Sequence, residues 1–317
     1  MLTPENTHRT LHVFNPSHDE ALAAGTPYYY PSVIARKLAS AWALLPALWA
    51  NNGDVVWVPD GVSTSSIPDW AQHVKLVHQS DFKKAFWETV HEIAPWGWDA
   101  LVRQQLNKAG APQTLLPNDE TLANVRQLSS RNTTALVLPK LRQMLHEQGI
   151  DTVGTSHIAT SLTDVEVFIH AHGEAMAKAL WSCSGRGVFR ITPPLSESCI
   201  GRIKRLLREQ GAVELEPLYN SVMDFALEFE ASADGNIHYT GVSLFHTTPN
   251  GGYSGNIIAP QTALQQLLPF SEATHQALIK ACCSMGQVAI DVEKHCDGNI
   301  PACFSQLFHV QKTLHNK

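Results

Sequence analysis

The residues most suggestive of chemistry lie in one stretch, KALWSCSGRGV at residues 178–188. Lys178 falls on an expected strand, directly before a loop of small residues (182–187) that turns into a second strand. Small residues let backbone N–H groups approach phosphate oxygens, and the lysine ammonium adds a point charge. No GK[ST] follows and the next element is a strand, so this is not a P-loop. We interpret the loop as phosphate-binding, although an ordinary Gly-Arg-Gly turn explains it equally well when the segment is taken alone.

A second candidate is the acidic strand VELEP at residues 213–217. Such a strand could present backbone groups and the Glu216 carboxylate to an adenine ring. Taken alone, Glu216 is explained more simply as a solvated strand end. The order of elements around it is more specific: strand, glycine loop, strand, helix, acidic strand, hairpin and helix.

The elements that would position these residues begin with a region that alternates between strand and helix. We expect strands at residues 11–14 and 54–59, a helix over 32–50 kinked at Pro46, and a helix over 99–109. This rhythm favours a small parallel sheet. His18 and Asp19 follow the first strand, where open α/β sheets place ligands, although helix capping is the simpler role for Asp19.

The second half predicts a mixed α+β region. Glycines and a Thr163–Glu166 capping box mark helix ends, and Asp234-Gly235 is a strong hairpin signal. The helices expected here cover residues 133–148, 163–172, 197–210 and 271–284. The expected strands are 175–181, 188–191, 212–216, 223–231, 236–247 and 287–293, with a second turn at Asp297-Gly298.

Length and composition limit the classes of protein that fit. The chain has 317 residues, 44% hydrophobic and 16% charged, which predicts about two globular domains. Its formal charge of −6 has no basic run, so neither nucleic acid nor a membrane is expected as a partner. The first residues lack a signal-peptide pattern, and the six cysteines lack zinc-site spacing. We therefore expect a reduced, cytoplasmic protein.

The sequence resembles the ATP-grasp superfamily of nucleotide-dependent ligases over roughly residues 120–310. It looks closest to an uncharacterised bacterial ATP-grasp group with phrases such as FNPSHDEALA (14–23), KALWSCSGRGV (178–188), EPLYNSVMDFALEF (216–229) and SLFHTTPNGGYSGN (243–256). The resemblance implies an α/β and α+β fold. A small pre-ATP-grasp α/β domain would cover residues 1–119. An ATP-grasp domain of two α+β subdomains would cover 120–317, with a divergent or truncated C-terminal end.

The resemblance also implies roles for individual residues. Arg131 and Lys178 match the two phosphate-contacting bases, and the loop that closes over the phosphates matches Ser182, Ser184, Gly185 and Gly187. Glu216 and Leu218 match positions that face the adenine, and Asp224 falls near the ribose-binding acid. Asp291 matches the first carboxylate that binds Mg2+. Arg186 is a candidate to contact phosphate or substrate, although a solvated loop arginine is equally plausible.

One part of the sequence departs from the family pattern. After the Asp-Gly turn the superfamily has a Glu-x-Asn pair that holds two magnesium ions, but residues 300–308 read IPACFSQLF and lack the glutamate. Losing a bidentate carboxylate should weaken magnesium binding severely. Glu293, two residues after Asp291 on the same expected strand, is a candidate to compensate.

These features lead to three alternative functions. The first is an ATP-dependent carboxylate–amine ligase that acts through an acyl phosphate, with ATP and Mg2+ as cofactors. Its substrate would be a small carboxylate or amino-acid-like molecule near residues 250–256, and it could act as a homodimer. The second is a nucleotide-binding protein of the same fold whose catalysis is impaired or lost. A third, weaker reading is an interaction module that has kept the fold without nucleotide.

Overall fold

A computed structural model of the chain describes residues 9–294, except Ser66, Ser184, Val222, residues 233–235 and Asn250. For residues 286–294 it describes the backbone alone. The chain divides into two compact units, Met1–Arg126 and Gln127–Lys317. This division falls inside the helix α5 (Asp119–Leu128), whereas the sequence analysis places the boundary at residue 119.

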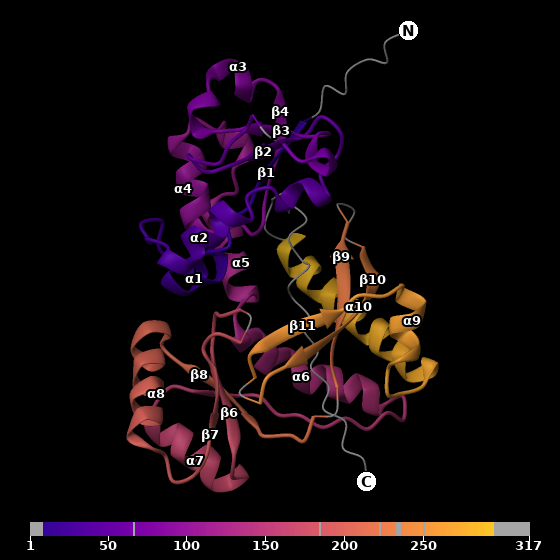
Figure 1. The fold of residues 1–317 in the computed structure, drawn as a ribbon. Coiled ribbons are helices and arrows are strands. Elements are labelled where there is room, and N and C mark those ends of the chain that lie inside the picture. Colours follow the sequence, from indigo (N-terminus) through magenta and orange to yellow (C-terminus); the bar gives the residue numbers. More distant parts are fainter. Residues whose placement is uncertain are drawn as a thin grey trace. The chain divides into compact units, whose positions relative to one another are not determined.

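The first unit is built on a parallel sheet with the strand order β3-β2-β1-β4 (Figure 1). Chain order alternates strands with helices, as the sequence pattern predicts. The strands are β1 (Arg9–Val13), β2 (Val55–Trp57), β3 (Lys75–Val77) and β4 (Val90–Pro95). The helices are α1 (His18–Ala24), α2 (Val33–Ala41), α3 (Lys84–Trp87) and α4 (Ala100–Lys108).

This sheet has hydrophobic side chains on both faces. Along β2, Val55 packs in a cluster with Leu106 of α4, while its neighbour Val56 packs in a second cluster with Ala47. Successive strand residues point to opposite faces, so two buried neighbours require cover on both sides. This unit is therefore a layered α/β structure.

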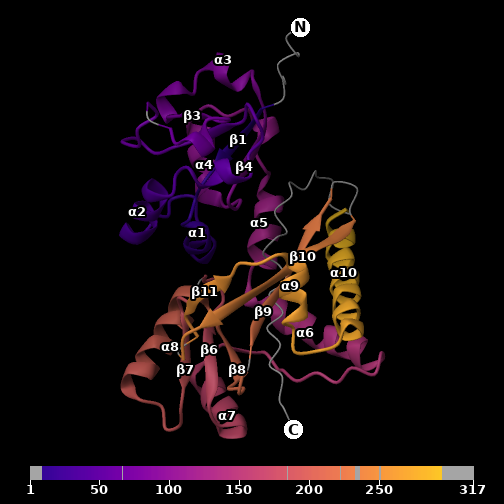
Figure 2. The same ribbon diagram turned by 45° about the vertical axis from the view of Figure 1, so that its right-hand side comes forward.

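The second unit begins with an antiparallel sheet of order β5-β8-β6-β7. Two helices, α7 (Leu162–His172) and α8 (Glu197–Gln210), cover one face of it (Figures 1 and 2). The strands are β5 (His157–Ala159), β6 (Ala175–Ala179), β7 (Val188–Ile191) and β8 (Val213–Pro217). Apolar residues at alternate positions of β6 and β8 form this core.

The same unit contains a second antiparallel sheet, of order β11-β10-β9. Helices α6 and α10 pack together on it (Figure 2), and their buried residues Leu145 and Leu278 belong to its core. The strands are β9 (Asp224–Ala231), β10 (Ile237–Thr247) and β11 (Tyr253–Ile257). The helices are α6 (Arg131–His146), α9 (Gln261–Gln266) and α10 (Glu272–Lys294). The predicted combination of an α/β region and an α+β region is thus confirmed.

Three local predictions are wrong. The helix expected over residues 32–50 ends at Ala41, and Pro46 lies instead in a short 3-10 helix, Leu45–Leu48. Proline lacks an N–H and clashes with the preceding turn, so it ended the helix rather than kinking it. The capping box of α7 is formed by Ser161 and Asp164, not by Thr163 and Glu166. Two boxes overlap in this sequence, and the earlier serine starts the helix.

The third error concerns residues 287–293, which continue the helix α10 instead of forming a strand. The glycine at position 286 predicts a helix end after residue 284. An interior glycine costs only about 1 kcal/mol relative to alanine, so a single glycine does not by itself end a helix. The predicted turn at Asp297-Gly298 lies outside the described residues. No helix in the described part of the chain is long and apolar enough to cross a membrane.

Candidate functional site

The candidate site lies on the face of the β5-β8-β6-β7 sheet opposite the α7/α8 core. Ala177 and Ala179 of β6, like Val213 and Leu215 of β8, point into that core. Side chains alternate along a strand, so Lys178, Glu214 and Glu216 must point to the other face. In the β6–β8 register, Lys178 lies opposite Glu214. Strand pairing therefore places one cation between two carboxylates.

The lysine forms a close ion pair across this face. The Nζ atom of Lys178 lies 2.6 Å from Oε2 of Glu216, and their side chains are 12% and 22% exposed. The two residues that sequence analysis assigned to phosphate and to adenine are thus neighbours. A partly exposed lysine that is paired in this way can exchange its partner for an incoming anion.

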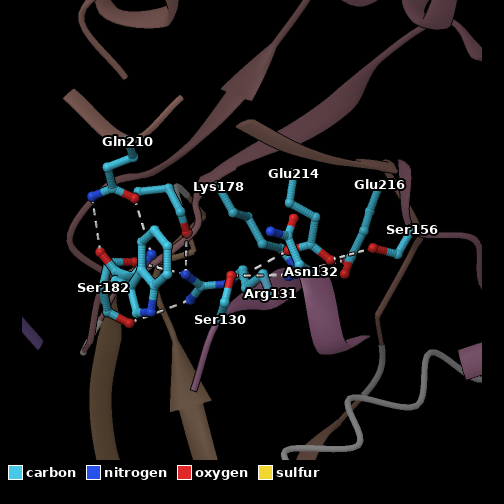
Figure 3. Close-up of polar contacts among 11 residues, drawn as sticks. Ser130, Arg131, Asn132, Ser156, Lys178, Ser182, Gln210, Glu214 and Glu216 are labelled. Atoms are coloured by element: carbon cyan, nitrogen blue, oxygen red, sulfur yellow. Dashed lines mark hydrogen bonds and ion pairs between the residues drawn. The ribbon is translucent and has the colours of Figure 1, made fainter. Parts of the chain in front are cut away.

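The arginine at the start of α6 connects this face to the glycine loop (Figure 3). The Arg131 guanidinium donates to Ala179 O and, over 2.9 Å, to Ser182 Oγ. Its Nε lies 3.5 Å from Glu214 Oε2. The N-cap Ser130, whose Oγ accepts from Asn132 N, fixes the first turn of the helix. Arg131 and Lys178 are thus brought into one charged cluster, but Arg131 also holds the base of the loop.

Glu214 is the most buried member of the cluster. Its side chain is 1% exposed, and Oε1 accepts a 2.6 Å hydrogen bond from Ser156 Oγ. Oε2 is buried and accepts no hydrogen bond from the described residues; its 3.5 Å contact with Arg131 Nε is an ion pair. Burial raises the pKa of Glu214, and Glu216 adds to this rise. The nearby Lys178 opposes it, as do Ser156 and Arg131, without cancelling it.

Glu214 and Ser156 were not identified from the sequence. One signal was available for the glutamate: in VELEP two acids alternate with two apolar residues, which puts both carboxylates on one strand face. Ser156 carried no such signal.

The glycine loop between β6 and β7 packs closely against another glycine segment. Gly185 and Gly187 have φ angles of +75° and +70°, which favour glycine. A Cβ atom on Gly185 would lie 2.4 Å from Gly252 Cα, so this approach requires a glycine. At the base of the loop, Gln210 bonds both backbone groups of Trp181, at 3.0 and 3.2 Å. The predicted phosphate loop is thus anchored at its base and touches the segment predicted to face the substrate.

The remaining predicted residues are placed as follows. Arg186 is exposed on the loop, where its N–H donates to Cys183 O at 2.9 Å. The N–H of Leu218 donates to Glu174 O at 2.9 Å, just beyond β8. Asp224 accepts from Thr247 Oγ1 at 2.6 Å and from Ser221 Oγ at 3.3 Å, so its hydrogen bonds lie within the β9 sheet region. Ser184 lies outside the described residues.

The predicted magnesium ligand Asp291 falls on α10, where side chains are not described. Within the described residues, no group of three or more His, Cys, Asp or Glu side chains could hold a metal ion. Within the same residues, Arg131, Lys178 and the glycine loop supply two cations and approachable backbone N–H groups beside one another. Asp291 and Glu293 stay predictions.

In the first unit, a polar network follows the ends of β1 and β4. His18 Nδ1 lies 3.1 Å from Asp99 Oδ2, and Asn15 Nδ2 donates to the same oxygen at 3.1 Å. Asp99 also caps α4 through Val102 N. Asp19 lies in the first turn of α1, whose N-cap is Ser17. The capping carboxylate that makes a hydrogen bond here is thus Asp99 on α4.

No protein-family model and no curated protein matches the sequence. Among solved structures, similar ones include N5-carboxyaminoimidazole synthetase from Staphylococcus aureus complexed with ADP. It is 14% identical with a TM-score of 0.42, covering 86% of this chain and 63% of that one. The L-amino acid ligase from Bacillus licheniformis is 13% identical with a TM-score of 0.43, covering 90% and 60%.

D-alanyl-alanine synthetase A from Vibrio cholerae O1 biovar eltor is 12% identical with a TM-score of 0.46, covering 90% of this chain and 81% of that one. The chain spans less than two thirds of the length of the first two proteins. Two of these three solved proteins are synthetases and one is a ligase, and all three TM-scores lie below 0.5.

Proposed function

We propose that this chain binds ATP on the face formed by β6 and β8 and uses it as a carboxylate–amine ligase. The observation that carries the proposal is the cluster of Lys178, Arg131, Glu214 and Glu216 beside a glycine loop. Two cations and approachable backbone N–H groups are the features that bind a polyphosphate. The resemblance of the sequence to ATP-grasp proteins supports the same reading.

In this proposal each residue of the site has a separate role. Lys178 leaves Glu216 to contact a phosphate oxygen, and Glu216 becomes available to the adenine together with the backbone near Leu218. Arg131, at the base of the loop beside Ser182, contacts another phosphate oxygen, and the glycines let the loop close on the phosphates. Asp224 would reach the ribose. Mg2+ would supply charge neutralisation of the phosphates, with Asp291 as its proposed ligand.

The reaction would proceed in two transfers. A substrate carboxylate oxygen attacks the γ-phosphorus of ATP, which gives an acyl phosphate and ADP. An amine then attacks the acyl carbon, the C–N bond forms, phosphate leaves and the amine loses a proton. The names of the similar solved structures, which include an L-amino acid ligase and D-alanyl-alanine synthetase A, suggest small carboxylates or amino acids as substrates. We expect the protein to act in the cytoplasm, in line with its cysteine spacing.

Thermal unfolding and calorimetry with MgATP test the binding step. We expect ATP to raise the unfolding temperature of the wild type and Lys178→Met to weaken binding about 10–100-fold, as for a lost charged contact. Lys204→Met, on an exposed position of α8, is the matched control and should bind normally. Absence of ATP binding by the folded wild type would refute the proposal.

The second candidate is a nucleotide-binding protein without turnover. It is favoured by residues 300–308, which lack the glutamate expected of the superfamily. Release of ADP with MgATP, small carboxylates and amino acids separates the two. ATP binding without ADP release under these conditions would favour the second candidate.

A further inference from the structure

The charged cluster on β6 and β8 is balanced before any nucleotide binds. It contains two cations, Arg131 and Lys178, and two carboxylates, Glu214 and Glu216. A phosphate chain that binds both cations adds negative charge to the cluster. The cations then neutralise the charges of the two carboxylates less effectively. The consequence for Glu214 rests on the proposed nucleotide site.

The two carboxylates differ in their access to water. Glu216 is 22% exposed, and water can solvate its charge when Lys178 moves away. Glu214 is 1% exposed, and its Oε2 accepts no hydrogen bond from the described residues. A buried carboxylate without partners is far more costly than a neutral carboxyl group. Protonation of Glu214 would therefore offset the added negative charge at the lowest free-energy cost.

We propose that Glu214 is a positioning residue that pairs with Arg131 and lies opposite Lys178 before nucleotide binds, and that takes up a proton on Oε2 when the phosphates draw these cations away. The proton comes from the solvent, and no covalent bond other than O–H is formed. Nucleotide binding is in this way coupled to the uptake of up to about one proton.

The groups that face Glu214 set the direction of the pH dependence. Lys178 on β6, Arg131 on α6 and the Ser156 hydroxyl before β5 favour its charged form, whereas burial and Glu216 on the same strand disfavour it. Bound phosphates draw Lys178 and Arg131 away from Glu214 and add negative charge near it. Both changes disfavour the charged form of Glu214. Glu214 thus holds its proton more tightly in the complex, and affinity falls as pH rises through the range between the two pKa values, by at most tenfold per pH unit.

Calorimetric titration with ATP in buffers of different ionisation enthalpy measures this proton directly. In a series of pH values above the ordinary pKa of a glutamate, the wild type should take up more protons than Glu214→Gln, because a glutamine has the same shape and cannot titrate. Protons bound by the nucleotide itself occur in both proteins and cancel. Asp54→Asn changes a buried carboxylate of the first unit and, if it remains folded, should retain the wild-type uptake.

A second variant keeps the test decisive if Glu214→Gln does not fold. Ser156→Ala removes the hydrogen bond to Oε1 but leaves the carboxylate, so the proton uptake should move to higher pH. Equal uptake in wild type and Glu214→Gln, or an unchanged profile in Ser156→Ala, would overturn the role of Glu214 while ATP still binds. No ATP binding by the wild type would instead refute the proposed function.

Discussion

Asp54 in the first unit and Glu214 in the second are both buried carboxylates beside basic side chains, yet they are held in opposite ways. Asp54 accepts hydrogen bonds from the backbone N–H groups of Thr10 and Asn51, at 3.0 and 2.8 Å. His12 Nε2 lies 3.1 Å from its Oδ2. Glu214 accepts one hydrogen bond, from Ser156, and its other oxygen has none within the described residues.

The pKa values of these two groups shift in opposite directions for this reason. Burial alone would raise the pKa of Asp54, but the hydrogen bonds from Thr10, His12 and Asn51 outweigh it and lower the pKa. Burial dominates at Glu214 and raises the pKa. Fixed backbone donors make Asp54 a structural anchor between β1 and β2. Side-chain cations that can turn to a ligand leave Glu214 poised to change its charge.

The largest expected effect is that of Asp54→Asn on stability. An asparagine would set its NH2 group against donors that now bind the carboxylate, so unfolding in urea at pH 7 should cost about 2–3 kcal/mol less. Asp60→Asn, at a carboxylate that is 88% exposed, should change stability by less than about 0.5 kcal/mol. Equal stabilities of wild type and Asp54→Asn would remove the contrast with Glu214.

The stability difference between the wild type and Asp54→Asn should depend on pH, because the pKa of Asp54 is lowered. Its stabilisation is fully present above the unfolded-state pKa, near 3.9, and is lost as pH falls through the lower folded-state value. Urea midpoints should therefore differ by a constant amount between pH 5 and 7. Below pH 4 the two proteins should converge; a gap that widens there would contradict the assignment.

Glu214→Gln should raise stability at high pH, whereas Asp54→Asn lowers it. The raised pKa of Glu214 means that the charged form is disfavoured in the fold, so its stability is present below the unfolded-state pKa and is lost as pH rises through the folded-state value. The variant should match the wild type at low pH and exceed it at high pH, by about 2–4 °C for each kcal/mol in thermal unfolding. Glu209→Gln, at an exposed position on α8, is the control. A variant that melts lower at high pH would show that Glu214 is also a structural anchor.

Ser156→Ala should give the smallest change. It removes one hydrogen bond to Glu214 and should destabilise the second unit by about 1 kcal/mol at pH 7. The loss should shrink at low pH, where a protonated Glu214 depends less on the bond. A pH-independent loss in thermal unfolding would instead point to packing around Ser156.

Sequence patterns predicted those parts of the fold that depend on local chemistry. Alternating apolar residues placed β6 and β8, the Ser/Gly composition identified the loop between β6 and β7, and Gly211 marked the end of α8. The same patterns were wrong at two positions within or beside predicted helices. Gly286 did not end α10, and Pro46 divided an expected helix. The short strand β5 was not predicted, because three residues carry too little periodicity.

The sequence alone predicts which residues could bind a phosphate and that Lys178 and Glu216 lie on strands. Their 2.6 Å ion pair became visible in the folded structure, because strand register joins residues far apart in the chain. The hydrogen bond between Ser156 and Glu214 joins residues 58 positions apart, and it cannot be predicted from the two residue types. The protonation behaviour of Glu214 likewise depends on burial and on the side chains around it, and both are set by packing rather than by local sequence.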